Sequence, residues 1–195
     1  MSEPPLKITV ATVTYNAAAL MERTIASVEE QNYRHVEHII VDGNSEDSTL
    51  ELIHHYQERN SVADIRHEIA CLSEPDNGLY DAMNKAIDMA TGHYIVFLNA
   101  GDRFHSSNTL SLIASAAATA RPAVVYGDTH LVDGTGRPNA SAGGLSATAC
   151  WYATRLSSHA PTWPAVAAMT CATASRPTLT GASASCARRA GKRRS

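Results

Sequence analysis

Three apolar stretches of this chain each end on side chains that could contact a ligand. Residues 7–15, 38–42 and 94–98 are apolar runs of strand length. If they pair as parallel strands, their carboxyl ends meet at one edge of the sheet, where open α/β sheets bind their ligands. One polar strand end is ordinary turn chemistry, whereas three at a common edge favour a binding site. The candidate residues are Thr14, Tyr15, Asn16, Asp42, Asn99 and Asp102.

A nucleotide is the first ligand to consider at such an edge. The chain has no GxxxxGK[ST] motif and no GxGxxG after its first apolar run, which argues against a P-loop NTPase and a nicotinamide dehydrogenase. A divalent cation can neutralise a pyrophosphate without a glycine loop, using one or two carboxylates, phosphate oxygens and water as ligands. Asp102, which follows a buried run, is placed to be such a carboxylate.

The elements that must position these residues alternate along the first part of the chain. Segments of helical period follow the apolar runs, and a capping box of Ser48 and Glu51 is expected to open one of them. Strands separated by helices predict βαβ units, and therefore an α/β fold with a mostly parallel sheet and helices on both faces. The expected strands are 7–15, 38–42, 64–70, 94–98 and 123–126, and the expected helices are 20–31, one from residue 48, 79–89 and 109–119, with a turn at Asp133-Gly134.

The chain has two parts of different composition. Residues 1–137 hold all 19 acidic residues and 9 of the 16 basic ones, whereas residues 138–195 hold 7 basic residues and no acidic one. In that second part 30 of 58 residues are Ala, Ser or Thr, and only 4 are Leu, Ile, Val or Phe. This is too little apolar surface to offset the chain entropy lost on folding. We therefore expect one folded unit at 1–137 and an irregular or disordered basic tail at 138–195.

Several other classes of protein do not match the sequence. No apolar run approaches the roughly 18 residues of a membrane span, and residues 1–7 lack the pattern of a signal peptide. The four cysteines form no CxxC pair and have no paired spacing with histidine, which argues against a disulfide framework or a zinc site. We expect a soluble protein of a reducing compartment. The basic C-terminal end is interpreted as solvated, so no nucleic-acid partner is expected.

Five motifs resemble family-2 glycosyltransferases of the GT-A fold, and in particular bacterial enzymes that build surface polysaccharides or exopolysaccharides. The resemblance covers about residues 8–133. The motifs are VTYN (13–16), IIVDGNSEDST (39–49), EPDNGLYDAMNKAI (74–87), GHYIVFLNAGD (92–102) and VYGD (125–128). Their order and spacing agree with those of the family.

The resemblance implies a role for each matching residue. The end of the first strand would line a nucleotide pocket, Asp42 would contact the base and ribose with Gly43 in place of a second acid, and Asp81 would lie near the sugar and diphosphate. The usual Asp-x-Asp metal motif here reads Asn-Ala-Gly and is followed by Asp102, the expected ligand of Mn²⁺ or Mg²⁺. The complete set for the nucleotide sugar is Thr14, Tyr15, Asn16, Asp42, Asp81, Asn84, Lys85 and Asn99.

The reaction implied by the resemblance is transfer of a sugar, with inversion, from a UDP- or GDP-linked donor to a hydroxyl of a glycan or a lipid-linked acceptor. In this family the general base is an acid of the second half, and residues 138–195 contain none. We therefore expect a chain with little or no transferase activity. The family also suggests a cytoplasmic location, with peripheral association at the inner face of the membrane as an option.

A reading-frame disruption near residues 134–143 is our hypothesis for the missing acid. Read in the neighbouring frame, permitted codons for residues 147–157 spell HGMLVCHQAF, and those for 177–182 spell DVDWC. Both products resemble the second half of this enzyme group.

Three alternatives remain at this point. A nucleotide-sugar-binding protein without catalytic activity would also lack the base. A nucleotidyltransferase of similar topology would begin with a Gly-rich loop and a basic residue, and VTYNAAAL has neither. Nucleic-acid binding through the tail would depend strongly on salt, but no aromatic platform accompanies those charges.

Overall fold

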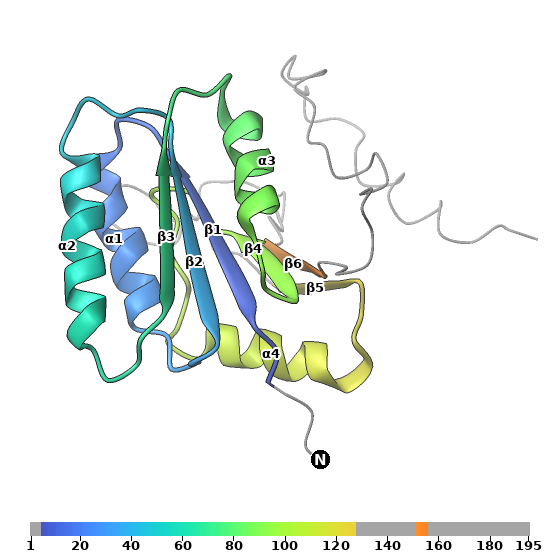
Figure 1. The fold of residues 1–195 in the computed structure, drawn as a ribbon. Coiled ribbons are helices and arrows are strands. Elements are labelled where there is room, and N and C mark those ends of the chain that lie inside the picture. Colours follow the sequence, from blue (N-terminus) through green and yellow to red (C-terminus); the bar gives the residue numbers. More distant parts are fainter. Residues whose placement is uncertain (1–4, 128–150, 156–195) are drawn as a thin grey trace, which may run out of the picture.

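The computed structural model describes residues 5–127 and 151–155 (Figure 1). Within them, helices and strands alternate as the periodicity predicts. The elements are β1 (Ile8–Thr14), α1 (Ala18–Glu29), β2 (Val36–Asp42), α2 (Thr49–Val62), β3 (Glu68–Ser73), α3 (Leu79–Met89), β4 (Tyr94–Phe97), α4 (Thr109–Ala120), β5 (Val124–Gly127) and β6 (Trp151–Arg155).

The described strands form one sheet in the order β3-β2-β1-β4-β6-β5. β1 pairs in parallel with β2 and β4, and β2 pairs in parallel with β3. β6 is antiparallel to both β4 and β5. The expected α/β fold with a mostly parallel sheet is therefore confirmed.

Helices cover both faces of the sheet, and side-chain alternation decides which residues they meet. Val13 and Val41 face α3, where they pack with Ala82 and Met83. The opposite face of β2 packs against α1 and α2, with Ile40 in one cluster with Met21, Ile25, Ile53 and Tyr56. Figure 1 shows α3 in front of the sheet and α1 and α2 together at its left. All side chains of β1 and β2 are buried, as expected for central parallel strands.

The structure differs from the sequence prediction in the tail. Residues 138–195 were expected to be irregular, but Trp151–Arg155 forms β6 between β4 and β5. Trp, Tyr and Thr have high strand propensity, and the free side of β4 offers unpaired backbone groups to such a segment. The remainder of 138–195 and the predicted Asp133-Gly134 turn lie outside the described residues.

Two local predictions also need correction. The third strand begins at Glu68 and ends at Ser73, a few residues later than expected. Ser48 is the residue before α2, but its side chain makes no capping hydrogen bond. Asp47 performs that function instead, because its carboxylate accepts a hydrogen bond from the Thr49 backbone N–H at 3.0 Å. None of the described helices combines the length and the hydropathy of a membrane span.

Candidate functional site

Backbone pairing brings the carboxyl ends of β1, β2 and β4 to one edge of the sheet. Thr14, the last residue of β1, is in register with Asp42, the last of β2. The chain after β4 continues beside β1, because the Leu98 N–H donates to the Ala11 carbonyl at 2.9 Å and the Ala100 N–H to the Val13 carbonyl at 3.3 Å. This carboxyl edge lies at the top of Figure 1. The three predicted strand ends are therefore neighbours.

The Asp42 carboxylate is fully buried and holds the loop that follows β2. It accepts hydrogen bonds from the Ser45 backbone N–H at 2.9 Å, the Ser45 hydroxyl at 2.5 Å and the Ser73 hydroxyl at 2.7 Å. The exposed fraction of the whole residue is 0%. The described structure thus places Asp42 at the predicted edge, with its oxygens bonded inside the protein.

Asn16 and Tyr15 extend the edge beyond the end of β1. The Asn16 N–H donates to the Ser45 hydroxyl at 2.8 Å, and the Asn16 side-chain oxygen accepts from the Glu46 N–H at 2.9 Å. Asn16 adopts a φ of 46°, a left-handed conformation that asparagine tolerates better than most residues. Ser45 therefore joins the ends of β1 and β2. Tyr15 is 63% exposed at the same edge.

The N-terminus of α1 is already capped by the loop before α2. The Ala18 N–H donates to the Asp47 carboxylate at 3.0 Å, and the Ala17 N–H to the Thr49 hydroxyl at 3.1 Å. Hydrogen bonds from the Thr49 hydroxyl and the Ala18 N–H lower the pKa of Asp47. A free helix N-terminus can bind phosphate, but here protein groups hold these two amides.

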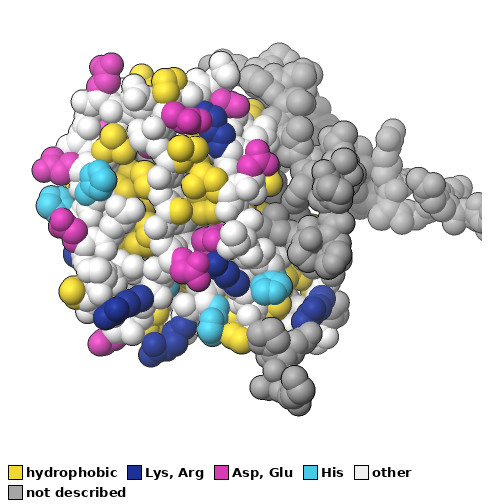
Figure 2. All heavy atoms as spheres, viewed as in Figure 1, with side chains coloured by type: hydrophobic (Ala, Val, Ile, Leu, Met, Phe, Trp, Pro, Cys, Tyr) yellow, Lys and Arg dark blue, Asp and Glu magenta, His cyan; other side chains and the backbone are white. Residues whose placement is uncertain are grey.

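The start of α3 carries a network of opposite charges. The Asp81 carboxylate accepts from the Asn77 N–H at 3.0 Å, and the Lys85 ammonium lies 2.9 Å from Glu74 and 3.7 Å from Asp81. The Asn77 N–H, and then the charge of Lys85, hold the pKa of Asp81 below its usual value, whereas the hydrogen bond to Glu74 raises the pKa of Lys85. Asn84 is half-buried on the same helix. Figure 2 shows acidic side chains beside a basic one near the upper edge of this face.

Two buried oxygen atoms at this edge have no hydrogen-bond partner among the described residues. They are the Thr14 hydroxyl oxygen and the Asn99 side-chain oxygen. Thr14 is only 6% exposed. Since buried polar groups are nearly always paired, these two atoms indicate positions where a ligand or water would bind.

The loop that carries Asp102 is attached to α1. The Thr24 hydroxyl donates to the Asp102 carbonyl at 2.7 Å and accepts from the Gly101 N–H at 2.8 Å. Gly101 has a φ of 98°, which strongly favours glycine there. Desolvation raises the pKa of Asp102, and the nearby positive charge of Arg23 opposes part of this shift. Arg23 is a basic residue beside this loop that the sequence did not predict, because a helix position alone does not reveal which loop it meets.

The residues at this edge offer the oxygen ligands that a hard divalent cation prefers. Asp102 offers a carboxylate, and Asn99 offers an amide oxygen that no other described residue bonds. Mg²⁺ is commonly held by one or two protein oxygens together with substrate phosphates. Within residues 5–127 and 151–155 no group of three or more His, Cys, Asp or Glu residues gathers as a metal centre. A cation at Asp102 therefore stays a prediction, in which the phosphates of a donor complete the set of ligands.

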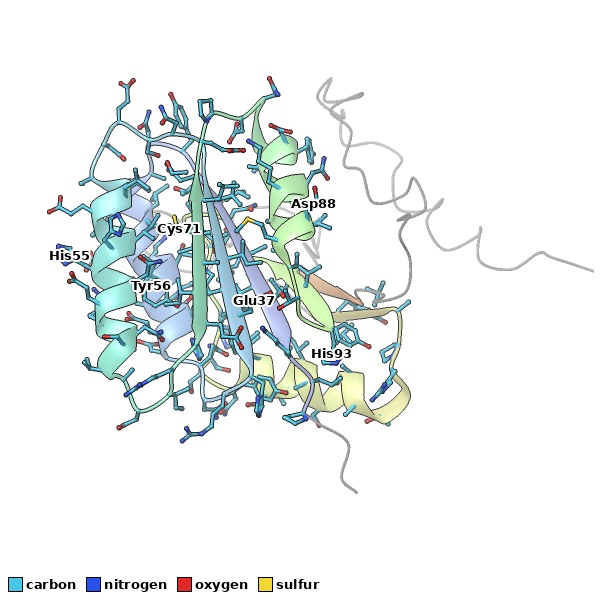
Figure 3. The ribbon with its side chains drawn as sticks, in the orientation of Figure 1. Glu37, His55, Tyr56, Cys71, Asp88 and His93 are labelled. Atoms are coloured by element: carbon cyan, nitrogen blue, oxygen red, sulfur yellow. The ribbon has the colours of Figure 1, made fainter. Side chains whose placement is uncertain are left out.

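A second polar cluster lies at the opposite end of the sheet. Glu37 accepts hydrogen bonds from the Thr9 hydroxyl at 2.6 Å and the Thr91 N–H at 2.9 Å, and lies 3.3 Å from the Lys7 ammonium. Figure 3 places Glu37 and His93 toward this amino-terminal end, away from the loops of the carboxyl edge. All groups of this cluster are mutually bonded, so it is structural.

Comparison with known proteins decides the family. Residues 9–176 match the family described as Glycosyl transferase family 2. The chain belongs to that family. The matched range passes residue 137 and enters the basic tail.

One curated relative is named a glycosyltransferase, and two solved structures share the fold of this chain. A PGL/p-HBAD biosynthesis glycosyltransferase of Mycobacterium bovis is 33% identical over 129 residues, covering 66% of this chain and 48% of the relative. A mannosyltransferase of Pyrobaculum calidifontis, solved with GDP-Man and Mn²⁺, is 26% identical with a TM-score of 0.54, covering 67% of this chain and 36% of that one. TarS of S. aureus with UDP-GlcNAc has a TM-score of 0.58 at 23% identity, covering 68% and 37%, and supports the GT-A-like fold alone.

This family-2 chain spans about half the length of the curated relative that it matches. Its fold and its membership of a glycosyltransferase family are therefore shown for the part that aligns.

Proposed function

We propose that this chain binds a nucleotide-diphosphate sugar at the carboxyl edge of β1, β2 and β4. The observation that carries the proposal is the pair of buried oxygens of Thr14 and Asn99, which have no partner within residues 5–127 and 151–155 and lie where the three strand ends meet. A family-2 fold whose edge leaves such groups unsatisfied has a physical reason to take a polar ligand there. The Pyrobaculum calidifontis neighbour, solved with GDP-Man and Mn²⁺, supports a donor of this class.

The roles proposed for the edge follow from the chemistry of each side chain. Asp102 and Asn99 would hold Mn²⁺ or Mg²⁺ against the diphosphate, and the cation would stabilise the charge that develops on the leaving group. Asp81, in the first turn of α3, and Asn84 and Lys85, in its middle, would lie toward the sugar and diphosphate. The remaining edge residues, Thr14, Tyr15, Asn16 and Asp42, would form or support the nucleoside end.

The reaction we propose for the enzyme type is inverting transfer to a hydroxyl of a glycan or lipid-linked acceptor in polysaccharide biosynthesis, in the cytoplasm or peripherally at the inner face of the membrane. A general base must take the proton of that hydroxyl. Because residues 138–195 hold no acidic side chain, we propose that this chain is impaired in transfer.

Donor binding tests the first part of the proposal. Titration calorimetry with UDP- and GDP-sugars, with and without Mn²⁺, should show binding that Mn²⁺ strengthens. Asp102→Ala should remove the Mn²⁺-dependent gain, whereas Asp88→Ala, an exposed acid on α3 shown in Figure 3, should behave like the parent chain. Absence of binding by the parent to any of these donors would contradict the proposal.

The second candidate function is nucleotide-sugar binding without catalysis, which the lack of acidic residues in 138–195 favours. The encoding DNA separates the two. An uninterrupted neighbouring frame across this stretch, encoding an acidic segment of the DVDW type, would support a disrupted transferase. Stop codons in that frame would favour a binding protein.

A further inference from the structure

Asp42, the carboxylate expected to contact the donor nucleoside, already accepts hydrogen bonds from other residues of the protein. Asp42 accepts three hydrogen bonds from Ser45 and Ser73, and none of its surface is exposed. A ligand could contact this carboxylate only if the Ser45 loop opened. Its visible role is to hold the loop that also fixes Asn16.

A different carboxylate, that of Asp76, lies beside the residue that follows Asp42. A Cβ atom placed on Gly43 would be 2.7 Å from the Asp76 Oδ2 atom and 3.3 Å from the Tyr15 ring. The space that a side chain at position 43 would fill is therefore taken by Asp76 and bordered by Tyr15. Val13 and Val41 face α3, and Tyr15 and Gly43 come two residues later, which keeps them on the α3 side by strand alternation.

The two oxygens of Asp76 have different surroundings. Oδ1 accepts a hydrogen bond from the Gly78 N–H at 2.7 Å, just before α3, and this bond fixes the carboxylate. Oδ2 lies beside Gly43, and the Tyr15 ring borders the same space next to Gly43. Asp76 is half-buried and Tyr15 is 63% exposed. A carboxylate fixed beside an exposed aromatic ring suits a nucleoside. The planar base would stack on the ring, and an N–H or O–H of the nucleoside would donate a hydrogen bond to Oδ2.

We propose that Asp76, and not Asp42, is the carboxylate that accepts a hydrogen bond from the nucleoside of the donor, with Tyr15 as the ring against its base. This proposal rests on the proposed function and names the residue that selects the nucleoside end of the ligand. Asp42 then acts as a positioning residue for the loop of Ser45.

The test is nucleoside-diphosphate binding by the full chain, measured with UDP and GDP. Asp76→Asn keeps the size of the side chain and an acceptor for the Gly78 N–H, but it loses the charge. It should weaken binding of the preferred nucleotide about tenfold or more. A hydrogen bond to a charged group typically contributes more free energy than a tenfold change in the dissociation constant requires. Tyr15→Ala should also weaken binding, and its exposed position makes misfolding no concern. Asp88→Asn is the matched control and should bind like the parent.

A relocation variant makes the test specific. Gly43→Asp combined with Asp76→Gly moves the carboxylate from position 76 to the adjacent position 43. This double variant should recover part of the nucleotide affinity that Asp76→Gly alone loses. A 2′-deoxynucleotide separates the two possible donors: if the ribose hydroxyl is the partner, the loss in Asp76→Asn disappears with the deoxy ligand, and if the base is the partner, it persists.

Two results would overturn the inference. If the parent binds UDP or GDP and Asp76→Asn binds it equally well, Asp76 does not contact the nucleoside. If Asp42→Asn, with unchanged unfolding midpoint, loses binding more strongly than Asp76→Asn, the carboxylates have the opposite roles. A parent chain that binds no nucleotide would instead defeat the proposed function itself.

Discussion

At the scale of single residues, the carboxyl edge contains polar atoms that the protein has satisfied and others that it has not. The Asp42 oxygens are bonded to Ser45 and Ser73, whereas the Thr14 hydroxyl and the Asn99 amide oxygen have no partner among the described residues. A satisfied group stabilises the fold, and an unsatisfied buried group costs free energy until a ligand or water binds. This difference yields a direct test.

Thr14→Val removes the unpartnered hydroxyl and keeps the shape of the side chain. We expect the free energy of unfolding without donor to stay equal or to rise by about 1 kcal/mol, while donor affinity falls. Thr12→Val is the matched comparison, because the Thr12 hydroxyl lies 2.9 Å from the His38 Nε2 atom, and it should destabilise the protein. Urea unfolding measures both. A Thr14→Val variant as unstable as Thr12→Val would show that the Thr14 hydroxyl is paired.

His38 makes stability depend on pH. Complete burial, and then the neighbouring His67, lower the pKa of His38 to about 3, whereas in the unfolded chain it is ordinary, at about 6.5. Between these values the unfolded chain binds the extra proton, so the stability present above about pH 6.5 is lost as the pH falls toward 3.

Thermal unfolding at pH 7.5 and 5.5 tests this dependence. The buried His67, whose pKa is also lowered, adds in the same direction. The expected loss between the two conditions is about 1 kcal/mol for His38. A His38→Gln variant should lose this share of the pH dependence, and His55→Gln, on the exposed face of α2 in Figure 3, should keep it. Equal pH dependence in all three chains would contradict the assignment.

At the scale of elements, close approach of β1 to the start of β4 sets where the strand ends meet. Gly92 permits this approach, because its N–H donates to the Thr9 hydroxyl at 3.1 Å and a Cβ there would lie 2.5 Å from that oxygen and 2.8 Å from the Thr9 nitrogen. The backbone nitrogen cannot move aside without disturbing the ladder that aligns β1 with β4.

Gly92→Ala should therefore destabilise the chain by about 1–3 kcal/mol, the usual cost of overpacking a filled site. Ser115→Ala, an exposed change on α4, should stay within about 0.5 kcal/mol of the parent. Urea unfolding of the two variants checks this, and equal stability would show that the strands can separate freely at this point.

At the scale of the whole molecule, the chain belongs to a glycosyltransferase family and spans about half the length of its curated relative. Our proposal assigns acceptor binding and the general base to the second half of the enzyme type, and residues 138–195 of this chain contain no acidic residue. We therefore expect this protein to bind a donor and to transfer its sugar little or not at all.

We expect an assay with labelled UDP- and GDP-sugars and Mn²⁺ or Mg²⁺ to detect binding but little or no transfer to glycan or lipid-linked acceptors. The physical reason is that, without a base, the acceptor hydroxyl keeps its proton in the transition state, and general base catalysis typically contributes about 10²–10⁴-fold. Robust turnover would show that another group in the chain takes the proton.

The sequence by itself determined the alternation of strands and helices, the mostly parallel sheet and the family, because period, strand-end chemistry and motif order are local properties of the chain. The structure has Asp42 as the last residue of β2 and both Asn99 and Asp102 in the loop that follows β4, while their roles stay predictions. The sequence did not foresee β6, because pairing with the free side of β4 is a long-range event.

Only the tertiary structure decided which polar atoms of the edge are available. Ser73 comes from β3 to bond Asp42, Thr24 comes from α1 to hold the loop of Asp102, and Asp76 meets Gly43 across the turn before α3. Each of these contacts joins residues far apart in the chain. Whether a carboxylate is bonded inside the protein or open to a ligand depends on such neighbours, and residue type and spacing do not specify them.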